Sequence, residues 1–215
     1  MRMPDPAILR LRDAKPIAVG QHRAIYAHPR DATLLVKVIR EDVAKTRWQR
    51  WPKRLQRALH YTGFVRELKE YIAVRARHPQ ADPPISRMLG VVDTDLGLGL
   101  VSEMVAGPDG HAAPTLAALY ERERGFQPWI EQALETLLRD LLASEVILGD
   151  LHPWNIVHGS DSRGGPRLVV VDGFGEKHLL PIRSMSRALN RGNTERLFRR
   201  MRGNLVKWLP LPPKG

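Results

Sequence analysis

Cysteine is absent from the 215 residues of this chain. Its absence excludes disulfides and thiolate metal sites, and it fits a reducing compartment. Long apolar runs are also missing, since no stretch approaches the roughly 18 residues that a membrane-spanning helix needs. The first six residues, Met1 to Pro6, contain no apolar segment of the kind that secretory signals carry. We therefore expect a cytoplasmic protein without a transmembrane segment.

Acidic residues are in the minority. The chain has 23 Asp and Glu against 34 Lys and Arg, which gives a net charge of +11. Much of the excess lies in segments 45–57 and 183–207, and the first of these also contains Trp48 and Trp51. Such segments attract anions, so nucleic acid or an acidic membrane surface is a candidate partner for each. The alternative is a solvated basic surface without a ligand, because a charge run alone identifies none.

Two short motifs carry the strongest chemical signal. Asp150 and Asn155 lie in the segment Gly-Asp-Leu-His-Pro-Trp-Asn, and Asp172 follows a hydrophobic run 22 residues after Asp150. Phosphoryl transfer needs a carboxylate beside the attacking hydroxyl, and oxygen ligands for the magnesium ion that neutralises the phosphates. Asp150 suits the first role, and Asn155 with Asp172 suits the second. The alternative is that Asp150 and Asn155 are turn formers at a junction of two elements.

Hydrophobic periodicity predicts a β-rich first part and a mainly helical second part. Short apolar runs at 17–19, 24–27 and 34–39 predict strands, and 87–93 and 98–105 predict two more joined by a turn. Apolar residues at helical spacing predict a helix over 63–77 and a long helix beginning near Pro128. A strand at 167–171 and a basic helix from about 181 to 207 complete the expectation.

These segments together resemble the bacterial PhoP regulatory network protein (YrbL-like) family. The resemblance is carried by Gly20 to Pro29 running into Leu35 to Val38, by Arg66 to Leu68, by Leu98 to Val105, and by Asp150 to Gly175. It implies an α+β, compact, two-lobed protein-kinase-like fold with a small antiparallel β-rich N-lobe and a short, mainly helical C-lobe. The whole of 1–215 would be one such domain, with an N-lobe over about 10–107, a C-lobe over about 108–208 and a frayed tail at 209–215.

The resemblance also implies a nucleotide site with ATP and Mg²⁺ as cofactors. Lys37 would contact the α- and β-phosphates, paired with a glutamate of the following helix. That glutamate is Glu67 or Glu70; the neighbouring apolar residues favour Glu67, with Glu70 pairing on the surface. The remaining expected contacts are Glu103 and Val105 at the adenine, Gly20 and Arg23 at the phosphates, Asn155 and Asp172 at the metal, and Asp150 as catalytic base.

Some features depart from ordinary kinases. Gly20 stands where kinases place three glycines, and Arg23 behind it is either a phosphate contact or an exposed hairpin arginine. Gly149 precedes the catalytic aspartate in place of an arginine, and the C-lobe is short. These departures leave more than one function open.

The sequence predicts an ATP- and Mg²⁺-dependent phosphotransferase acting on an acceptor hydroxyl. Two alternatives stay open beside it. One is a nucleotide-binding pseudokinase with a regulatory role, and the other is a basic module that binds nucleic acid or membrane surfaces. For the phosphotransferase, the basic segments hint at an anionic acceptor.

Overall fold

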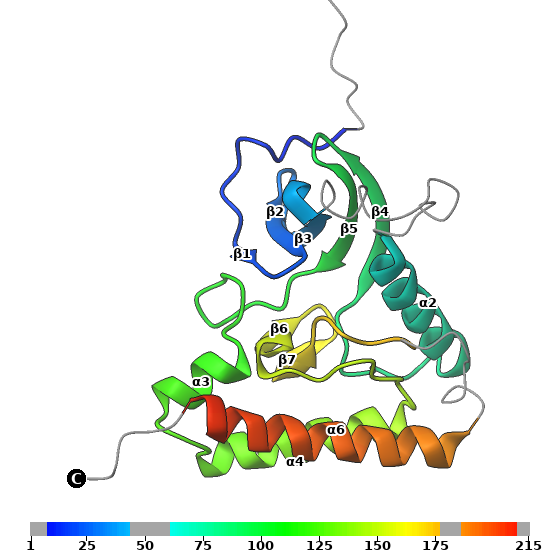
Figure 1. Ribbon diagram of the computed structural model, residues 1–215, viewed down its shortest axis with the longest axis vertical. Coiled ribbons are helices and arrows are strands. Elements are labelled where there is room, and N and C mark those ends of the chain that lie inside the picture. Colours follow the sequence, from blue (N-terminus) through cyan, green and yellow to red (C-terminus); the bar gives the residue numbers. More distant parts are fainter. Residues whose placement is uncertain (1–7, 44–60, 177–185, 210–215) are drawn as a thin grey trace, which may run out of the picture. The chain divides into compact units, whose positions relative to one another are not determined.

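The computed structural model describes residues 8–43, 61–176 and 186–209. The chain is a mixed α+β protein that folds into two compact units (Figure 1). Unit 1 is the described part of residues 1–68 together with Arg87–Met104, and unit 2 is Lys69–Ser86 together with the described residues from Val105 onward. The boundary after Met104 lies three residues before the expected end of the N-lobe, and unit 2 also takes in the second half of one helix.

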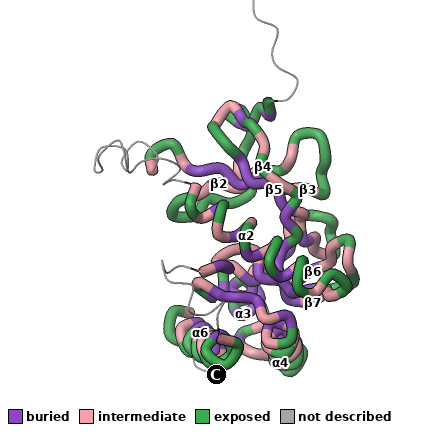
Figure 2. The backbone as a smooth tube through the Cα atoms, turned by 90° about the vertical axis from the view of Figure 1, so that its right-hand side faces the viewer, coloured by how far each residue is buried: buried purple, intermediate pink, exposed green. Residues whose placement is uncertain are grey.

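Unit 1 is built on an antiparallel five-stranded sheet in the order β1-β2-β3-β5-β4. Its strands are β1 Ala18–Val19, β2 Arg23–His28, β3 Asp31–Ile39, β4 Met88–Thr94 and β5 Gly97–Glu103. They confirm the strand expectations, because apolar runs separated by short turns pair as hairpins. The central strand β3 is buried on both faces over Val36–Ile39, as the purple tube of Figure 2 shows. Because side chains alternate along a strand, Lys37 points away from the face that carries Val36 and Val38.

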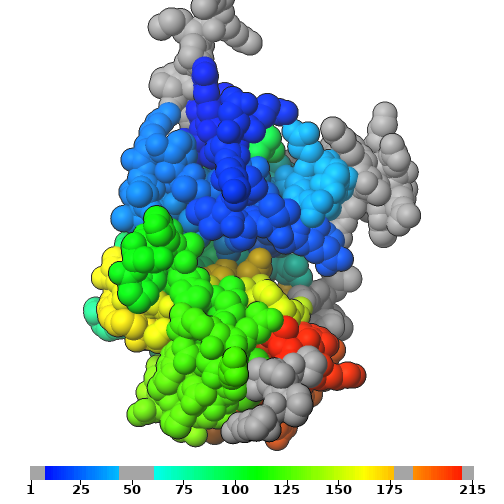
Figure 3. Space-filling view, turned by 90° about the vertical axis from the view of Figure 1, so that its left-hand side faces the viewer, coloured from blue at the N-terminus to red at the C-terminus, as the bar shows by residue number. Residues whose placement is uncertain are grey.

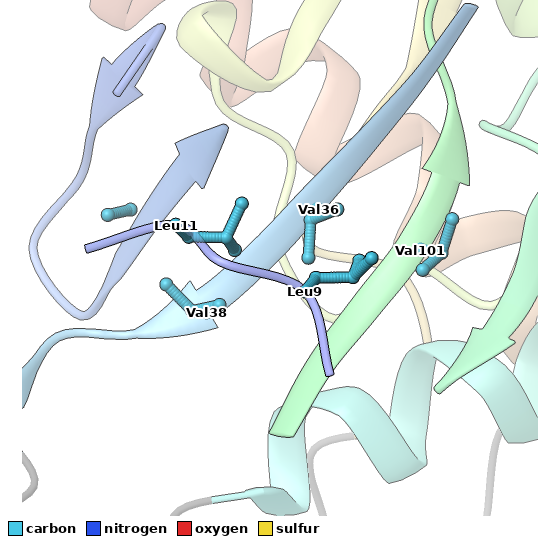
Figure 4. Packing of buried hydrophobic residues seen from close by; sticks show 6 residues of the cluster. Leu9, Leu11, Val36, Val38 and Val101 are labelled. Carbon is cyan, nitrogen blue, oxygen red and sulfur yellow. The ribbon is translucent and has the colours of Figure 1, made fainter. Parts of the chain in front are cut away.

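An N-terminal segment that the sequence did not predict covers one face of this sheet. Leu9 and Leu11 pack against Val36, Val38 and Val101 in the core of unit 1 (Figure 4). The Leu9 amide donates to the Asp93 carbonyl at 2.9 Å, and the Leu11 amide donates to Asp95 Oδ1 at 2.7 Å. Figure 3 shows this dark-blue segment running over the surface of unit 1. The segment covers the face of β3 opposite to the one from which Lys37 projects.

Helix α2, Thr62–Arg77, carries the boundary between the units within its length. Unit 2 then contains α3 Leu116–Arg122, α4 Pro128–Ala143, the short 3-10 helix η3 Pro153–Asn155, the hairpin β6 Ile156–Asp161 with β7 Gly164–Val170, and α6 Arg187–Trp208. The expected long helix begins at Pro128 as predicted, because proline tolerates the first helical position. Its buried stripe is Ile130, Leu134, Leu137 and Leu141.

Helix α6 packs against α4 (Figure 1), and it also contacts the 3-10 helix η3. Its buried residues are Asn190, Thr194, Phe198, Met201 and Leu205, which recur at helical spacing along one face. Two of the five are polar, so this face does more than fill a core. The expected frayed tail falls beyond α6, and its residues 210–215 lie outside the described part of the chain.

Candidate active site

The two motifs predicted to carry chemistry are joined by backbone hydrogen bonds in unit 2. The amides of Gly149 and Asp150 both donate to the Gly173 carbonyl, at 2.9 and 2.8 Å. The Gly175 amide donates to the Ile147 carbonyl at 2.7 Å. Segments 147–150 and 173–175 are therefore held side by side. The hydrogen bonds that join them use only backbone groups, which every residue but proline offers in full.

Gly173 is required by this contact. Its φ is +85°, in the left-handed region that side chains other than glycine's rarely occupy. A β-carbon at this position would lie 2.6 Å from the Asp150 carbonyl oxygen, well inside van der Waals contact. The glycine that follows Asp172 thus lets the predicted metal-binding segment approach the backbone of the loop that carries Asp150.

Asn155 and Asp172 lie at the same junction. The Val171 amide donates to the Asn155 carbonyl at 2.8 Å, and the Asn155 side-chain amide would lie 3.4 Å from a β-carbon at Gly173. Asp172 Oδ1 accepts the Gly173 amide at 2.6 Å, which fixes the orientation of the carboxylate. The structure therefore brings together the two side chains that the sequence predicts as metal ligands.

This donor set suits magnesium. Amide and carboxylate oxygens are hard ligands, and Mg²⁺ is commonly bound through one or two carboxylates together with substrate phosphates. No group of three or more His, Cys, Asp or Glu that could hold a metal ion occurs in the part of the chain that the structure describes. Asn155 and Asp172 would accordingly hold the ion together with oxygens of a bound phosphate chain.

The loop that carries Asp150 is exposed at the aspartate and anchored on both sides of it. Before Asp150, Asn193 of α6 donates to the Leu148 carbonyl at 3.3 Å. After Asp150, the His152 ring stacks on Trp208 of α6 with centroids 4.9 Å apart. Burial lowers the pKa of His152, although the negative charge of Asp150 acts in the opposite direction. A neutral imidazole is therefore favoured beside the indole.

The α6 anchors were not predicted from the sequence. Asn190 donates from Nδ2 to the carbonyls of Glu145 and Val146, at 3.1 and 3.2 Å, just before the loop. The signal that could have revealed them is a pair of polar residues, Asn190 and Thr194, on the face that the apolar spacing marks as buried. Nothing in the sequence connects Trp208 with His152, because they lie far apart along the chain.

In unit 1, Lys37 lies 3.5 Å from Glu67, between Nζ and Oε2, and both side chains are almost fully buried. The structure thus pairs the strand lysine with Glu67, the first of the two candidates. The other carboxylate oxygen of Glu67 binds Arg23. The Arg23 guanidinium also lies over the Phe64 ring, 5.1 Å from its centroid. Two cations thus contact the one carboxylate of Glu67.

Arg23 is therefore a half-buried partner of Glu67, not an exposed hairpin arginine. Gly20 has its backbone occupied within the hairpin: its amide donates to the Arg23 carbonyl at 2.8 Å, and its carbonyl accepts from Arg40 at 2.9 Å. The phosphate contacts assigned to Gly20 and Arg23 stay predictions.

The surface pairing expected for Glu70 is wrong. Glu70 is 7% exposed, and its Oε1 accepts the Ile147 amide at 2.7 Å. Burial raises the pKa of this carboxyl, while the hydrogen bond from Ile147 acts to lower it. The reason for the error is the face of α2 that Glu70 occupies: its carboxylate points into the interior of unit 2 and holds the residue three positions before Asp150.

At the segment expected to bind adenine, the Val105 carbonyl accepts the Ala113 amide at 2.9 Å. Among the described residues, no protein oxygen accepts a hydrogen bond from the Val105 amide. Glu103 ends β5, where its amide donates to the Arg87 carbonyl at 2.9 Å. Val105 belongs to a buried apolar cluster with Ala113, Val157 and Val169, and Val171 packs against it.

The structure describes only part of the two basic segments, 45–57 and 183–207. Segment 45–57, with Trp48 and Trp51, and residues 183–185 lie outside the described residues. Several arginines of α6 are paired: Arg187 with Glu145 at 2.6 Å, Arg191 with Glu195 at 3.1 Å, and Arg202 with Glu131 at 2.6 Å. Arg199, Arg200 and Lys207 are exposed. Within residues 8–43, 61–176 and 186–209, no helix is both long enough and apolar enough to cross a membrane.

Comparison with known proteins gives consistent matches over nearly the whole chain. The family model described as PhoP regulatory network protein YrbL matches residues 9–206. Uncharacterized protein YrbL of Escherichia coli (strain K12) is 30% identical over 196 residues, which cover 90% of this chain and 86% of that protein. Uncharacterized protein YrbL of Shigella flexneri matches with the same identity and coverage. With matches of this extent, the chain belongs to the PhoP regulatory network protein YrbL family.

Proposed function

We propose that this protein is an ATP- and Mg²⁺-dependent phosphotransferase of the protein-kinase-like superfamily. The observation that carries the proposal is the joining of the Asp150 loop to the Asp172 segment through Gly173. Three groups with complementary roles, a carboxylate and two oxygen ligands, are thereby supported by backbone hydrogen bonds at one junction.

Unit 1 supplies the second line of support. Burying the Lys37–Glu67 ion pair costs desolvation energy, and Arg23 adds a second cation at the same carboxylate. A positive group of this kind favours binding of a phosphate chain. The Val105 amide adds a backbone donor of the type that adenine accepts. The cofactor residues are accordingly Lys37, with Glu67 and Arg23 behind it, and the Glu103–Val105 segment.

In the proposed reaction the acceptor hydroxyl oxygen attacks the γ-phosphorus of ATP. The bond from that phosphorus to the β,γ-bridging oxygen breaks, ADP leaves, and the hydroxyl proton passes to the Asp150 carboxylate. Magnesium, held by Asn155 and Asp172, would neutralise charge on the phosphates. Asn193 and the Gly173 carbonyl keep the Asp150 backbone in place, which limits the reorganisation needed during the reaction.

A second candidate, a nucleotide-binding regulatory pseudokinase, is favoured by one observation. The Gly20 amide is bonded to the Arg23 carbonyl and its carbonyl to the Arg40 side chain, whereas an active phosphate loop offers free amides. The description of the family as a PhoP regulatory network protein is compatible with a regulatory role. Both candidates bind ATP, and turnover separates them.

The test compares wild type with Asp150→Ala and Asp172→Ala, measuring ATP affinity by calorimetry and ADP release in the presence of Mg²⁺. We expect Asp172→Ala to lose Mg²⁺-dependent affinity at least about tenfold. Asp150→Ala should keep its affinity and lose turnover by a factor of about 10² or more. Asp140→Ala, an aspartate on the surface of α4, is the matched control and should behave as wild type.

If Asp150→Ala turns over ATP as fast as wild type, the catalytic role fails and the pseudokinase candidate is favoured. If wild type binds no ATP with Mg²⁺, both candidates are wrong.

A further inference from the structure

An aromatic cluster lies immediately after Asp150 in unit 2. The His152 ring is flanked by Trp154 at 4.6 Å and Trp208 at 4.9 Å between centroids, and the two indoles are 6.0 Å apart. Trp154 and Trp208 are each 44% exposed. Two exposed indoles gathered in one place leave a large apolar area in water, and such patches mark binding surfaces. We call His152, Trp154 and Trp208 the aromatic platform.

A charged edge borders the platform on α6. At about 100° of rotation per residue, Asn193 adjoins the buried face, and Arg196, Arg200 and Lys207 lie within about 40° of one another on the exposed side next to Asn193. The opposite edge carries Arg202, which is bound to Glu131 of α4. Arg196 donates to Asn193 Oδ1 at 3.0 Å, and Asn193 holds Leu148. We call Arg196, Arg200 and Lys207 the basic edge.

Two residues of α6, Asn193 and Trp208, meet the loop that carries Asp150 at successive points. Asn193 touches the loop at Leu148, and Trp208 touches it at His152, with Asp150 between these two positions in the chain. Along α6 the interval from 193 to 208 spans about 22 Å at 1.5 Å per residue. Arg196 and Arg200 lie within that interval. An acceptor held near Asp150 would therefore have an apolar aromatic surface on one side and cationic side chains along the helix.

The shape of the platform argues against a nucleobase inserted between its rings. Ring separations of 4.6 and 4.9 Å leave no gap for a planar base, which would need about 7 Å between two rings in van der Waals contact. A flat outer indole surface remains, and the C–H face of a pyranose ring packs well on such a surface. A hydroxyl is needed in any acceptor of a phosphoryl group, and a sugar supplies several.

From these features we infer that the acceptor is an anionic sugar, such as a hexose phosphate, whose ring lies on the platform and whose phosphate or carboxylate lies at the basic edge. The inference rests on the proposed phosphotransferase function, because it places the acceptor hydroxyl at Asp150. It identifies the substrate class from Trp154, Trp208 and Arg200, which the sequence motifs did not include.

The experiment is calorimetric titration at 150 mM salt with glucosamine 6-phosphate, glucose 6-phosphate and mannose 6-phosphate. Glucosamine tests the ring without the anion, glycerol 3-phosphate tests the anion without the ring, and a ten-nucleotide oligothymidine tests nucleic acid. We expect at least one hexose phosphate to bind at least tenfold more tightly than glucosamine, glycerol 3-phosphate and the oligonucleotide.

Matched variants locate the site. Arg200→Gln should weaken hexose phosphate binding about tenfold, whereas Arg199→Gln should change it less than twofold. The two arginines are adjacent, both exposed, and about 100° apart around α6, so they differ in face and not in charge. Trp208→Ala should weaken binding at least tenfold, and Trp129→Phe, at an indole that packs on His158, should not. Thermal melts confirm that each variant is folded.

Several outcomes would overturn the inference: no hexose phosphate binding below 10 mM, tighter binding of the oligonucleotide, or equal effects of Arg199→Gln and Arg200→Gln. ATP affinity is measured on the same samples. If ATP binds but the sugars do not, the acceptor class is wrong and the phosphotransferase proposal stands. If hexose phosphate binds as expected but ATP does not, the sugar site stands and the phosphoryl transfer does not.

Discussion

At the scale of single residues, Glu70 shows how a candidate site depends on groups that do no chemistry. Its carboxylate is buried, and it accepts the backbone N–H of Ile147. Charge is unfavourable there because burial removes solvent, while the hydrogen bond needs an acceptor in either protonation state. The raised pKa means that the folded protein binds this proton more tightly than the unfolded chain does. The stabilising contribution is present below the ordinary value of 4.5 and is lost as the pH rises through the folded pKa.

We therefore expect Glu70→Gln to be more stable than wild type at pH 7, since glutamine keeps the acceptor and removes the charge. The difference should become small near pH 4, where the carboxyl is largely protonated in both states. Glu70→Ala should lose about 1–3 kcal/mol because the buried Ile147 amide loses its acceptor. Urea unfolding from pH 4 to pH 8 measures both effects, with Glu135→Gln on the exposed side of α4 as control. Equal stabilities of wild type and Glu70→Gln at pH 7 would contradict the burial argument.

The residues of the site differ in how far the sequence reveals them. Asp150, Asn155 and Asp172 were predicted as neighbours from their motif, in which an Asp is followed five residues later by an Asn and then by a hydrophobic run that ends in Asp-Gly. Lys37 with Glu67 was predictable because an apolar strand and an amphipathic helix each place one charged residue inward. Glu70 was misplaced because the helix buries two faces, and periodicity identifies one.

At the scale of elements, α6 is the helix whose importance the sequence conceals. Its charge predicted a solvated or anion-binding surface, yet its buried face holds Asn190 and the adjoining edge holds Asn193, both bonded to carbonyls at 145–148. The strand β6 was also missed, because polar residues over 158–161 interrupt its apolar pattern. Both depend on tertiary partners: α6 on the loop that carries Asp150, and β6 on its pairing with β7.

This placement of α6 gives a prediction for the loop. Asn190→Leu keeps the volume of the side chain and removes the donor to Glu145 and Val146, so we expect about 1–3 kcal/mol of destabilisation. For a chain of this size that corresponds to a decrease of roughly 2–12 °C in Tm. Hydrogen exchange should become faster at the amides of residues 146–150. Asn204→Leu, on the same helix, is the control, and unchanged exchange in Asn190→Leu would show that α6 does not hold the loop.

At the scale of the whole molecule, the net charge of +11 produces a field that the sequence alone establishes. Such a field attracts any polyanion, whatever the arrangement of individual side chains. It therefore cannot distinguish a nucleic-acid-binding module from an enzyme with an anionic substrate. The two are distinguished by whether binding of the anion depends on where on the protein surface a given basic side chain lies.

We expect weak binding of a single-stranded oligonucleotide that decreases at least about tenfold between 50 and 200 mM salt, because bound counterions are released on association. Arg199→Gln and Arg200→Gln should reduce this binding to the same extent, since each removes one charge from the same field. Fluorescence anisotropy over a salt series measures the slope for wild type and both variants. A specific nucleic-acid site would instead give binding that persists at 200 mM salt and one arginine whose loss matters far more. The sugar inference, by contrast, predicts unequal effects of these same two variants on hexose phosphate binding. The pair therefore distinguishes attraction by the charge of the whole protein from binding at a site beside Asp150.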